Sequence, residues 1–227
     1  FTLSQSHKKG YEILLKIKSI LNYNGNITHT KKVDSYCLAI TSKKLIRNLS
    51  KYGIIPNKSL ILEFPKELKL DYLKPFIRGY IDGDGSVGIY QKNRNIPLLC
   101  INFVGTELFM RKCLELLPIK GIFRKIKTSK NLYEIRYYGI KAVDFGKWLW
   151  ENKNLPVYYK EEIFNDYLKE NVENIEYRRN FHEKINNYLK EMNDGVSPTE
   201  MAKKYNTQPF YFFTLRRRSK NGKSFSN

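Results

Sequence analysis

Apolar residues recur at regular spacing in two stretches of the chain, and each stretch predicts two helices separated by a pair of strands. In the first stretch, apolar positions every three or four residues predict a helix over Tyr11–Leu21, and Gly25 closes this unit. Alternation of apolar and polar residues then predicts two strands within Asn26–Ile40, with a turn near Lys32–Asp34. A second helix is expected over Ser42–Tyr52, with basic side chains on its outer face.

The second stretch predicts the same elements in the same order. Its first helix is expected over Thr106–Leu117, and it ends near Gly121. Two strands follow over Ile122–Lys127 and Leu132–Tyr138, and the pattern closes with a helix over Ile140–Glu151.

Landmarks of the two stretches lie about a hundred positions apart. Gly121 follows Gly25 by 96 positions, and Lys160 follows Lys58 by 102 positions. Spacing that is preserved over several elements indicates an internal duplication. The chain is therefore expected to contain two copies of one structural unit.

The segment Asp71–Gly88 lies between the two stretches and predicts one more helix. Asp71 is a suitable N-cap, so the helix can run from about Tyr72 to Asp84 and stop at Gly85.

Two pairs of residues on this helix favour a function over stability alone. Gly79 and Gly83 lie four positions apart on one face, where the absence of side chains lets a second helix approach closely. Asp82 and Asp84 place two carboxylates at the negative end of the helix dipole, which is unfavourable without a compensating partner. A locally unfavourable arrangement of this kind is typical of a functional site.

The acidic pair is also compatible with a helix C-cap followed by a turn. A calcium loop is another alternative, because Asp82, Asp84 and Ser86 have the spacing of its first ligands. That loop requires Gly at the position of Val87 and Glu at the position of Asn93, so the sequence excludes it.

The composition points to a polyanionic partner. The chain has 41 Lys and Arg against 22 Asp and Glu, a formal net charge of +19, and 17 Tyr and 13 Phe spread through this basic background. Such an excess is most often a sign of nucleic-acid binding. A membrane partner is not expected, because the sequence has no apolar run of membrane-spanning length and no amphipathic anchor at its ends.

The three cysteines predict core thiols. Cys37, Cys100 and Cys113 are unclustered and stand in apolar contexts, with no CxxC pair that would indicate zinc. Free thiols are typical of a reducing intracellular compartment, here an organelle matrix, a bacterial cytoplasm or a phage-infected cell.

The nine residues Ile77–Gly85, IRGYIDGDG, resemble the LAGLIDADG motif of homing endonucleases. In that family two such helices pack at the domain centre, and each delivers one acid to a divalent metal at the DNA backbone. The resemblance implies that Asp84 is the metal ligand, helped by the backbone carbonyl of Gly83. It also implies Mg²⁺ as the cofactor, with Ca²⁺ or Mn²⁺ as substitutes.

The resemblance implies further catalytic positions outside the motif. The family places one lysine per repeat after the last helix, near the scissile phosphates, and Lys58 and Lys160 occupy those places. A lysine there can polarise the attacking water or stabilise charge on the phosphate, and a solvated loop lysine is the alternative. The family also places a polar residue near the catalytic water at a strand-to-helix junction, which Gln5 matches in the first repeat and Gly105 does not in the second.

The register of the duplication fixes where a first motif would stand. A shift of the Asp71–Gly85 helix by about a hundred residues places its counterpart about 20 residues before Phe1. Phe1–Ser6 would then be the end of the second strand of the first repeat. The two-acid site of the family is therefore half represented in this sequence.

Alternation after the motif predicts a sheet with one polar face. Val87 and Ile89 face the helices, and the residues between them face the other way, on a concave surface that can straddle a DNA groove. Ordinary solvation of strand side chains is the alternative. The candidate contacts to bases or phosphates are Ser86, Tyr90, Lys92, Asn102, Arg124, Glu134 and Arg136.

Beyond Glu170 the sequence becomes strongly charged and predicts a separate helical segment. Asn171–Glu176 is expected to be a linker, followed by a helix over Tyr177–Met192 and a turn at Gly195.

The end of this segment has the outline of a helix-turn-helix. A capping box at Ser197 opens a short helix, Asn206 breaks it, and Gln208–Arg218 forms a second helix. In such a motif the second helix enters the major groove, and an exposed tail that folds poorly is the alternative. The candidate DNA-binding residues on this helix are Arg216, Arg217 and Arg218.

Together these features predict an α+β protein with two pseudo-symmetric αββαββα LAGLIDADG repeats that form a DNA-binding saddle. The first repeat is assigned to residues 1–70 without its motif helix, the second to 71–170, and the helical DNA-binding segment to 171–227. The function implied by the resemblance is site-specific hydrolysis of phosphodiester bonds in a long double-stranded DNA target. A monomer with internal pseudo-two-fold symmetry is expected.

Non-cleaving proteins of the same fold remain as alternatives. An RNA maturase for intron splicing and a helix-turn-helix transcription regulator would both bind nucleic acid without metal-binding acids. The endonuclease region of an intein is a third context, but the sequence has no flanking splicing motif. An intact Asp84 favours the nuclease, because a protein that only binds does not need this carboxylate.

Overall fold

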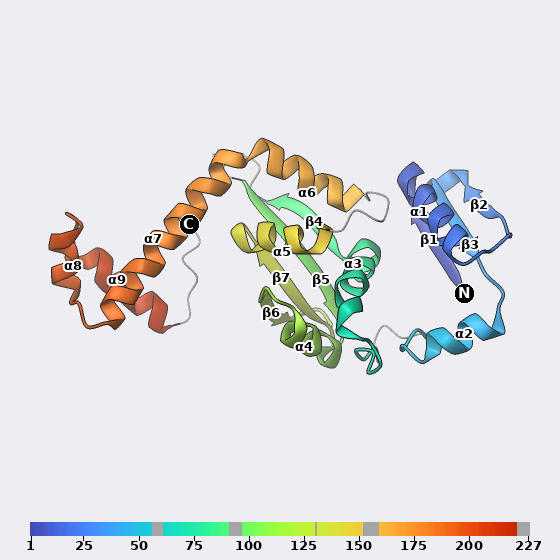
Figure 1. Cartoon of the computed structure of the whole chain (residues 1–227), viewed down its shortest axis with the longest axis horizontal. Helices are drawn as coiled ribbons and strands as arrows, with labels where there is room; N and C mark the ends of the chain where they lie inside the picture. Colours follow the sequence, from blue (N-terminus) through green and yellow to red (C-terminus); the bar gives the residue numbers. More distant parts are fainter. Residues whose placement is uncertain (56–60, 91–96, 130, 152–158, 222–227) are drawn as a thin grey trace. The chain divides into compact units, whose positions relative to one another are not determined.

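The chain folds into two compact units, Phe1–Glu170 and Asn171–Asn227. The computed structural model describes residues 1–55, 61–90, 97–129, 131–151 and 159–221 (Figure 1). Within these residues, no helix combines the length and the apolar character needed to cross a membrane. Cys100 and Cys113 are buried and Cys37 is half-buried, and all three are free thiols, as the sequence predicts.

The first sheet has three antiparallel strands in the order β1-β3-β2, and its core contains Leu14, Leu38 and Ile40. Asp34, in the left-handed conformation at φ 41°, ends the turn between β2 and β3 where the sequence predicts it. Ser42 caps the following helix by accepting a hydrogen bond from the Leu45 amide. The elements are β1 (Thr2–Ser6), α1 (His7–Ile20), β2 (Ile27–Thr30), β3 (Ser35–Ala39) and α2 (Lys43–Ser50).

The second sheet has four antiparallel strands in the order β4-β5-β7-β6. The order β5-β7-β6 repeats the order β1-β3-β2, and in each sheet a helix follows the corresponding first strand, so the predicted duplication and α+β class are confirmed. The elements are α3 (Leu73–Asp84), β4 (Ser86–Tyr90), β5 (Leu98–Gly105), α4 (Glu107–Leu116), β6 (Ile122–Lys125), β7 (Tyr133–Tyr138), α5 (Ile140–Trp150) and α6 (Tyr159–Glu170).

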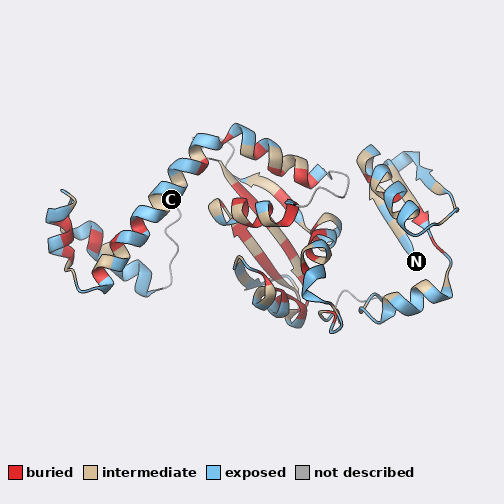
Figure 2. Cartoon of the chain, viewed as in Figure 1, coloured by how far each residue is buried: buried red, intermediate tan, exposed pale blue. Residues whose placement is uncertain are grey.

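The two faces of the second sheet differ in burial. Ile101, Phe103 and Ile135 lie on one face of the sheet and are fully buried. The helices α3, α4 and α5 pack against this sheet (Figure 1), and buried residues recur along its central strands (Figure 2). The side chains that alternate with them lie on the opposite face, where polar residues predominate. Packing of the apolar face against three helices therefore leaves the polar face available for another role.

Asp71 is not the N-cap of the motif helix, contrary to the prediction. A 3-10 turn over Leu70–Tyr72 precedes α3, and Tyr72 is the N-cap residue, without a side-chain cap. The chain has already turned when it reaches Asp71, because the Tyr72 amide donates to the Lys69 carbonyl at 2.9 Å. The other end of the helix agrees with the prediction, since α3 stops at Gly85.

The second unit is a three-helix cluster of α7 (Val172–Asn193), α8 (Pro198–Lys204) and α9 (Pro209–Lys220). The predicted linker over Asn171–Glu176 is wrong, because α7 begins at Val172 and buries Ile175 within its first turns. The predicted capping box is confirmed, with the Ser197 and Glu200 side chains each bonded to the backbone of the other residue. The core of the unit contains Ile185, Tyr188, Met192, Met201, Ala202, Phe212 and Leu215.

Candidate functional site

The two acids at the end of α3 lie in different surroundings. Asp82 is largely buried and pairs with Arg78, with 3.6 Å between Arg78 Nε and Asp82 Oδ2. Burial raises the pKa of the Asp82 carboxyl, although the cations of Arg78 and Lys160 act in the opposite direction. Asp84, at the end of the same helix, is exposed to solvent. Of the two carboxylates, that of Asp84 is therefore the one that is accessible for binding a ligand.

Lys160 caps the C-terminal end of α3. Its Nζ lies 2.8 Å from the carbonyl oxygen of Ile81, 2.9 Å from that of Asp82 and 3.5 Å from that of Gly83. The Ile81 carbonyl also accepts a hydrogen bond from the Gly85 amide at 2.9 Å. Carbonyls nearer the end of a helix have no partner within the helix, so the ammonium serves the Asp82 carbonyl and opposes the negative end of the dipole. Burial lowers the pKa of Lys160, whereas the negative charges of Asp82 and Asp84 raise it.

The position of Lys160 differs from the expected loop lysine beside a phosphate. The residue lies in the first turn of α6 and is only 3% exposed. The difference arises because Glu161 of α6 pairs with Arg78 of α3, and this contact brings the neighbouring Lys160 ammonium onto the α3 carbonyls instead of into solvent. Lys160 is nevertheless part of the predicted site, since its ammonium contacts the backbone of Gly83.

A buried ion pair fastens α6 to α3 beside this cap. Arg78 Nη2 donates to Glu161 Oε2 at 2.8 Å, and both side chains are buried. Sequence reasoning missed Arg78 and Glu161 as site residues. The only local indication was the spacing of Arg78 and Asp82, which lets them pair on one helix face.

The oxygen atoms at this helix end suit a hard divalent cation. The Asp84 carboxylate and the Gly83 carbonyl are neighbours in the chain, and oxygen ligands are those that Mg²⁺ and Ca²⁺ prefer. Within the described ranges, no three His, Cys, Asp or Glu side chains gather into a complete metal cage. Mg²⁺ sites built from one or two carboxylates are usually completed by water and substrate phosphates, so the pair fits such a site.

The glycine face of α3 is open. No atom from outside the helix lies within 4 Å of the position that a Cβ would take at Gly79 or Gly83, in the part of the chain that the structure describes. This face retains the room for a close helix–helix contact that the sequence predicts.

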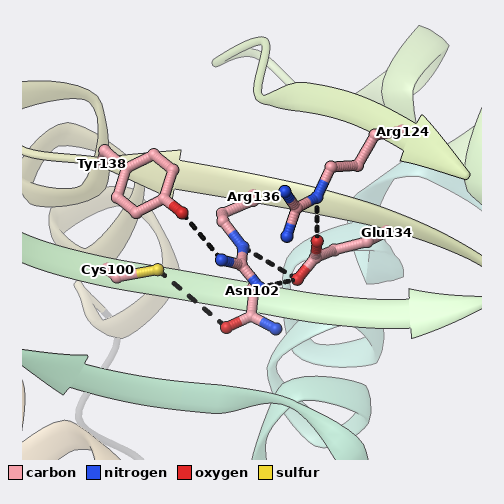
Figure 3. A network of polar contacts seen from close by, with 6 residues as sticks. All are labelled: Cys100, Asn102, Arg124, Glu134, Arg136 and Tyr138. Atoms are coloured by element: carbon pink, nitrogen blue, oxygen red, sulfur yellow. Dashed lines mark hydrogen bonds and ion pairs between the residues drawn. The ribbon is translucent and has the colours of Figure 1, made fainter. Parts of the chain in front are cut away.

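The predicted polar residues of the second sheet lie on one face. Cross-strand pairing aligns Ser86 with Asn102, and Asn102 with Arg136, so the three form a row across the sheet. Arg124 pairs with Glu134 in the next row (Figure 3). Tyr90 packs edge to face on Tyr138 at the end of the same surface, with ring centroids 6.1 Å apart.

Glu134 is not an exposed DNA contact, contrary to its predicted role. Its side chain is 3% exposed and accepts hydrogen bonds from Arg124 Nε at 2.6 Å and from Arg136 Nε at 2.8 Å (Figure 3). Arg136 also donates to the Tyr138 hydroxyl at 2.7 Å. A buried carboxylate that holds two arginines positions those arginines on the sheet rather than meeting a polyanion itself.

A family model described as a LAGLIDADG-like domain matches residues 71–186, which are 116 of the 227 residues. The chain belongs to the LAGLIDADG family. The resemblance predicted from Ile77–Gly85 is thereby confirmed. No curated protein sequence matches the chain.

Solved structures with the same fold are LAGLIDADG homing endonucleases. I-LtrWI bound to target DNA is 16% identical and has a TM-score of 0.51 over 77% of this chain and 83% of that chain. I-GzeII in complex with its DNA target is 11% identical, with a TM-score of 0.55 over 77% of this chain and 80% of that chain. A mutant of I-SmaMI is 13% identical, with the same TM-score and coverage. At these identities the likeness establishes the fold.

Three predicted LAGLIDADG site residues remain, and Gln5 is the one that lies within the described residues. Gln5 is half-buried in β1, next to the start of α1, as its assignment to a strand-to-helix junction requires. The equivalent junction has Gly105, where a Cβ would lie 3.1 Å from the Tyr80 hydroxyl, so the second repeat has little space for a side chain there. Lys58 and Lys92 lie outside the described residues.

Replacement of Asp82 by asparagine is expected to leave the LAGLIDADG chain at least as stable as wild type at neutral pH. Burial raises the pKa of this carboxyl above 3.8, so the folded state favours the protonated form. The wild-type free energy of unfolding should therefore fall as the pH rises from 3.8 through the folded-state pKa, and Asp82→Asn should lack this fall. Urea unfolding of both proteins across this range tests the prediction. A variant that is less stable at neutral pH would show that pairing with Arg78 outweighs burial.

Replacement of Glu134 by glutamine is expected to lower the free energy of unfolding by about 2 kcal/mol, because it leaves the mostly buried Arg136 without its anion. Arg124→Gln is the matched control, since Arg124 is 53% exposed and its loss leaves the Glu134–Arg136 pair in place. Urea unfolding should rank the control well above Glu134→Gln in stability. Equal losses would contradict a central role of Glu134 in this network.

Proposed function

We propose that the chain is a site-specific DNA endonuclease that hydrolyses phosphodiester bonds of a long double-stranded target with a divalent metal. The observation that carries this proposal is the exposed Asp84 carboxylate next to the Gly83 carbonyl, at the end of a LAGLIDADG helix. A binding protein has no need of an exposed carboxylate at the negative end of a helix dipole. An enzyme that uses a metal ion at the scissile phosphate needs such a carboxylate to bind the ion.

Asp84 and the Gly83 carbonyl would hold Mg²⁺, with Ca²⁺ or Mn²⁺ as substitutes. Bound there, the ion would supply charge neutralisation at the phosphate and a water of lowered pKa. Lys160 holds the end of α3 in place through the carbonyls of Ile81 and Asp82, so that both oxygens keep a fixed geometry. The ammonium of Lys160 also limits the negative charge that the site presents before metal and DNA arrive.

A second acid is expected from a matching motif helix that packs on the open face of Gly79 and Gly83. Lys58 is proposed to stabilise charge at the scissile phosphate, and Gln5 to orient the attacking water in the first repeat. The protein is proposed to act as a monomer with internal pseudo-two-fold symmetry in a reducing compartment.

DNA is proposed to lie across the polar face of the second sheet. Arg124 and Arg136 are fixed there by Glu134, and Asn102 and Ser86 extend the same surface. Fixed arginines lose little side-chain entropy when they meet a phosphate or a guanine. The relatives I-LtrWI and I-GzeII were each solved with target DNA, which supports this partner.

The helices α8 and α9 are proposed to form a helix-turn-helix that binds DNA outside the sheet contact. Tyr205–Gln208 separates the two helices, with Asn206 at φ 47°, and α9 carries the exposed Arg216, Arg217 and Arg218. A short capped helix, a tight break and a basic second helix are the parts of this motif.

The experiment that tests the proposed function selects a bound duplex from a randomised DNA pool in Ca²⁺ and then replaces Ca²⁺ by Mg²⁺. We expect the chain to retain one sequence family and then to break its strands at a fixed position. Affinity should fall steeply with salt, because the net charge of +19 favours counterion release. Retention of a sequence family without any strand break in Mg²⁺ would favour the regulator or maturase.

A further inference from the structure

The solvent side of α9 carries two large aromatic side chains. Phe210 is 79% exposed and Phe213 is 54% exposed. Phe212 and Leu215 point to the opposite side, where they join the core of the second unit. Helical spacing places Phe210, Phe213 and Arg217 on one face, at positions i, i+3 and i+7, directly away from that core.

Folding of the unit does not explain these two aromatic residues. Phe212 packs against Tyr188 with ring centroids 5.1 Å apart, and with Leu215 and Met201 it already fills the space between the three helices. The capping box at Ser197 and the proline at the start of α9 fix the ends of the helices. Paired exposed phenylalanines on an otherwise satisfied helix point to a binding surface.

The charges around this face select the kind of partner. In the sequence from Ser197 to Asn221, Glu200 is the only acidic residue, and its side chain is engaged in the capping box. The basic residues of the same stretch include the three consecutive arginines Arg216, Arg217 and Arg218, all of which are exposed in the second half of α9. An apolar patch that borders such a basic cluster complements DNA better than it complements an apolar protein surface.

The position of the aromatic residues on the helix then indicates what they contact. In a helix-turn-helix, residues in the N-terminal part of the second helix reach base edges in the major groove. The thymine C5-methyl is the apolar group that the major groove presents, and phenylalanine is one of the side chains that contact it. Phe210 and Phe213 occupy the first half of α9, and the arginines occupy the second half.

We propose that α9 recognises thymine methyl groups in the major groove through Phe210 and Phe213, while Arg217 and Arg218 bind the flanking phosphates. This inference rests on the proposed helix-turn-helix and specifies the base feature that it selects. It does not depend on cleavage, so a chain that binds DNA without cutting it can still show this preference.

The test compares two duplexes that differ only in thymine methyl groups. One is an alternating adenine–thymine duplex three helical turns long, and the other has deoxyuridine in place of every thymidine. Affinities are measured by fluorescence anisotropy with the full chain in EDTA, which prevents strand breakage. Removing a methyl group from water is worth roughly fourfold in an equilibrium constant, so two contacts predict a preference for thymine of roughly fifteenfold.

Matched variants assign that preference to α9. The double variant Phe210→Ala and Phe213→Ala is expected to bind both duplexes almost equally, and unchanged thermal unfolding would show that the fold is intact. Tyr177→Ala is the control: Tyr177 is 62% exposed on α7, and its replacement should leave the preference for thymine unchanged. Arg217→Gln should lower the affinity for both duplexes by the same factor, and it should reduce the salt dependence of that affinity.

A double variant that keeps the wild-type preference for thymine would overturn the inference. The inference is also overturned if wild type self-associates in sedimentation, the double variant does not, and the preference is unchanged, since the face would then be a protein interface. Failure of wild type to bind either duplex would instead reject the proposed DNA-binding function as a whole.

Discussion

Replacement of Lys160 by methionine is expected to lower the free energy of unfolding by about 3 kcal/mol. The methylene stem would still fill its buried place, but the Asp82 carbonyl would lose the Lys160 ammonium, and the Ile81 carbonyl would keep only the Gly85 amide as its donor. The buried Asp82 carboxyl would also lose a nearby cation. Unsatisfied buried polar groups and broken buried charge clusters are among the few changes that cost this much. Urea unfolding monitored by circular dichroism measures the loss.

Lys74→Met is the matched control for this variant. Lys74 also belongs to a charged pair on α3, with Nζ 2.7 Å from Glu151 Oε2, but the Glu151 side chain is largely exposed. Exposed ion pairs contribute little, so the control should be much closer to wild type. If both lysine variants lose the same stability, the cap described for Lys160 does not stabilise the helix end.

Lys160→Met is also expected to slow strand cleavage by on the order of 10²-fold with nearly unchanged DNA affinity, as loss of one positioned donor does. The reason differs from that of a lysine at the phosphate. In this structure the ammonium holds the backbone that carries the proposed metal-binding oxygens. Loss of affinity with an unchanged single-turnover rate would show instead that Lys160 only helps to anchor DNA.

Replacement of Asp84 by asparagine is expected to abolish cleavage and to leave specific binding intact. The amide keeps the size of the side chain but loses the charge that a hard cation requires, and metal stabilisation of a phosphoryl transition state is worth several kcal/mol. A loss of roughly 10³-fold or more in rate is therefore expected. In metal-free protein the variant should be equally or slightly more stable, because an exposed carboxylate opposes the helix dipole there.

Asp82→Asn is the control that separates the roles of the two acids. Asp82 lies beside Arg78 and Lys160 within the protein, so its amide should preserve most of the cleavage rate. Gel-shift affinity in Ca²⁺ and strand cleavage in Mg²⁺, measured for both variants on one duplex, give the comparison. If Asp84→Asn cuts at the wild-type rate, the metal is bound elsewhere and the motif helix serves only in helix packing.

The motif helix and the sheet faces could be predicted because their causes are local. Helical spacing, Gly85 and the acidic pair mark α3, and alternation alone assigns Ser86, Asn102 and Arg136 to one face. Strand pairing then follows from burial of the intervening apolar residues.

Contacts between distant parts of the chain could not be predicted in the same way. Lys160 is separated by 79 residues from the Ile81 carbonyl, and no local pattern records that pairing. The burial of Glu134 depends on which charges β6 and β7 bring together, which alternation does not specify. The linker error has a similar cause, since Ile175 is one apolar residue in a charged run and only packing shows that it is buried.

The role of Asp84 in metal-dependent cleavage is best tested by single-turnover cleavage of a duplex selected by binding, with wild type and Asp84→Asn at saturating protein. We expect wild type to break the bound duplex at a fixed position when Mg²⁺ is added and not in EDTA. Asp84→Asn should bind the same duplex and leave it whole. A wild-type complex that remains uncut in Mg²⁺, or an Asp84→Asn complex that is cut equally fast, would contradict this role.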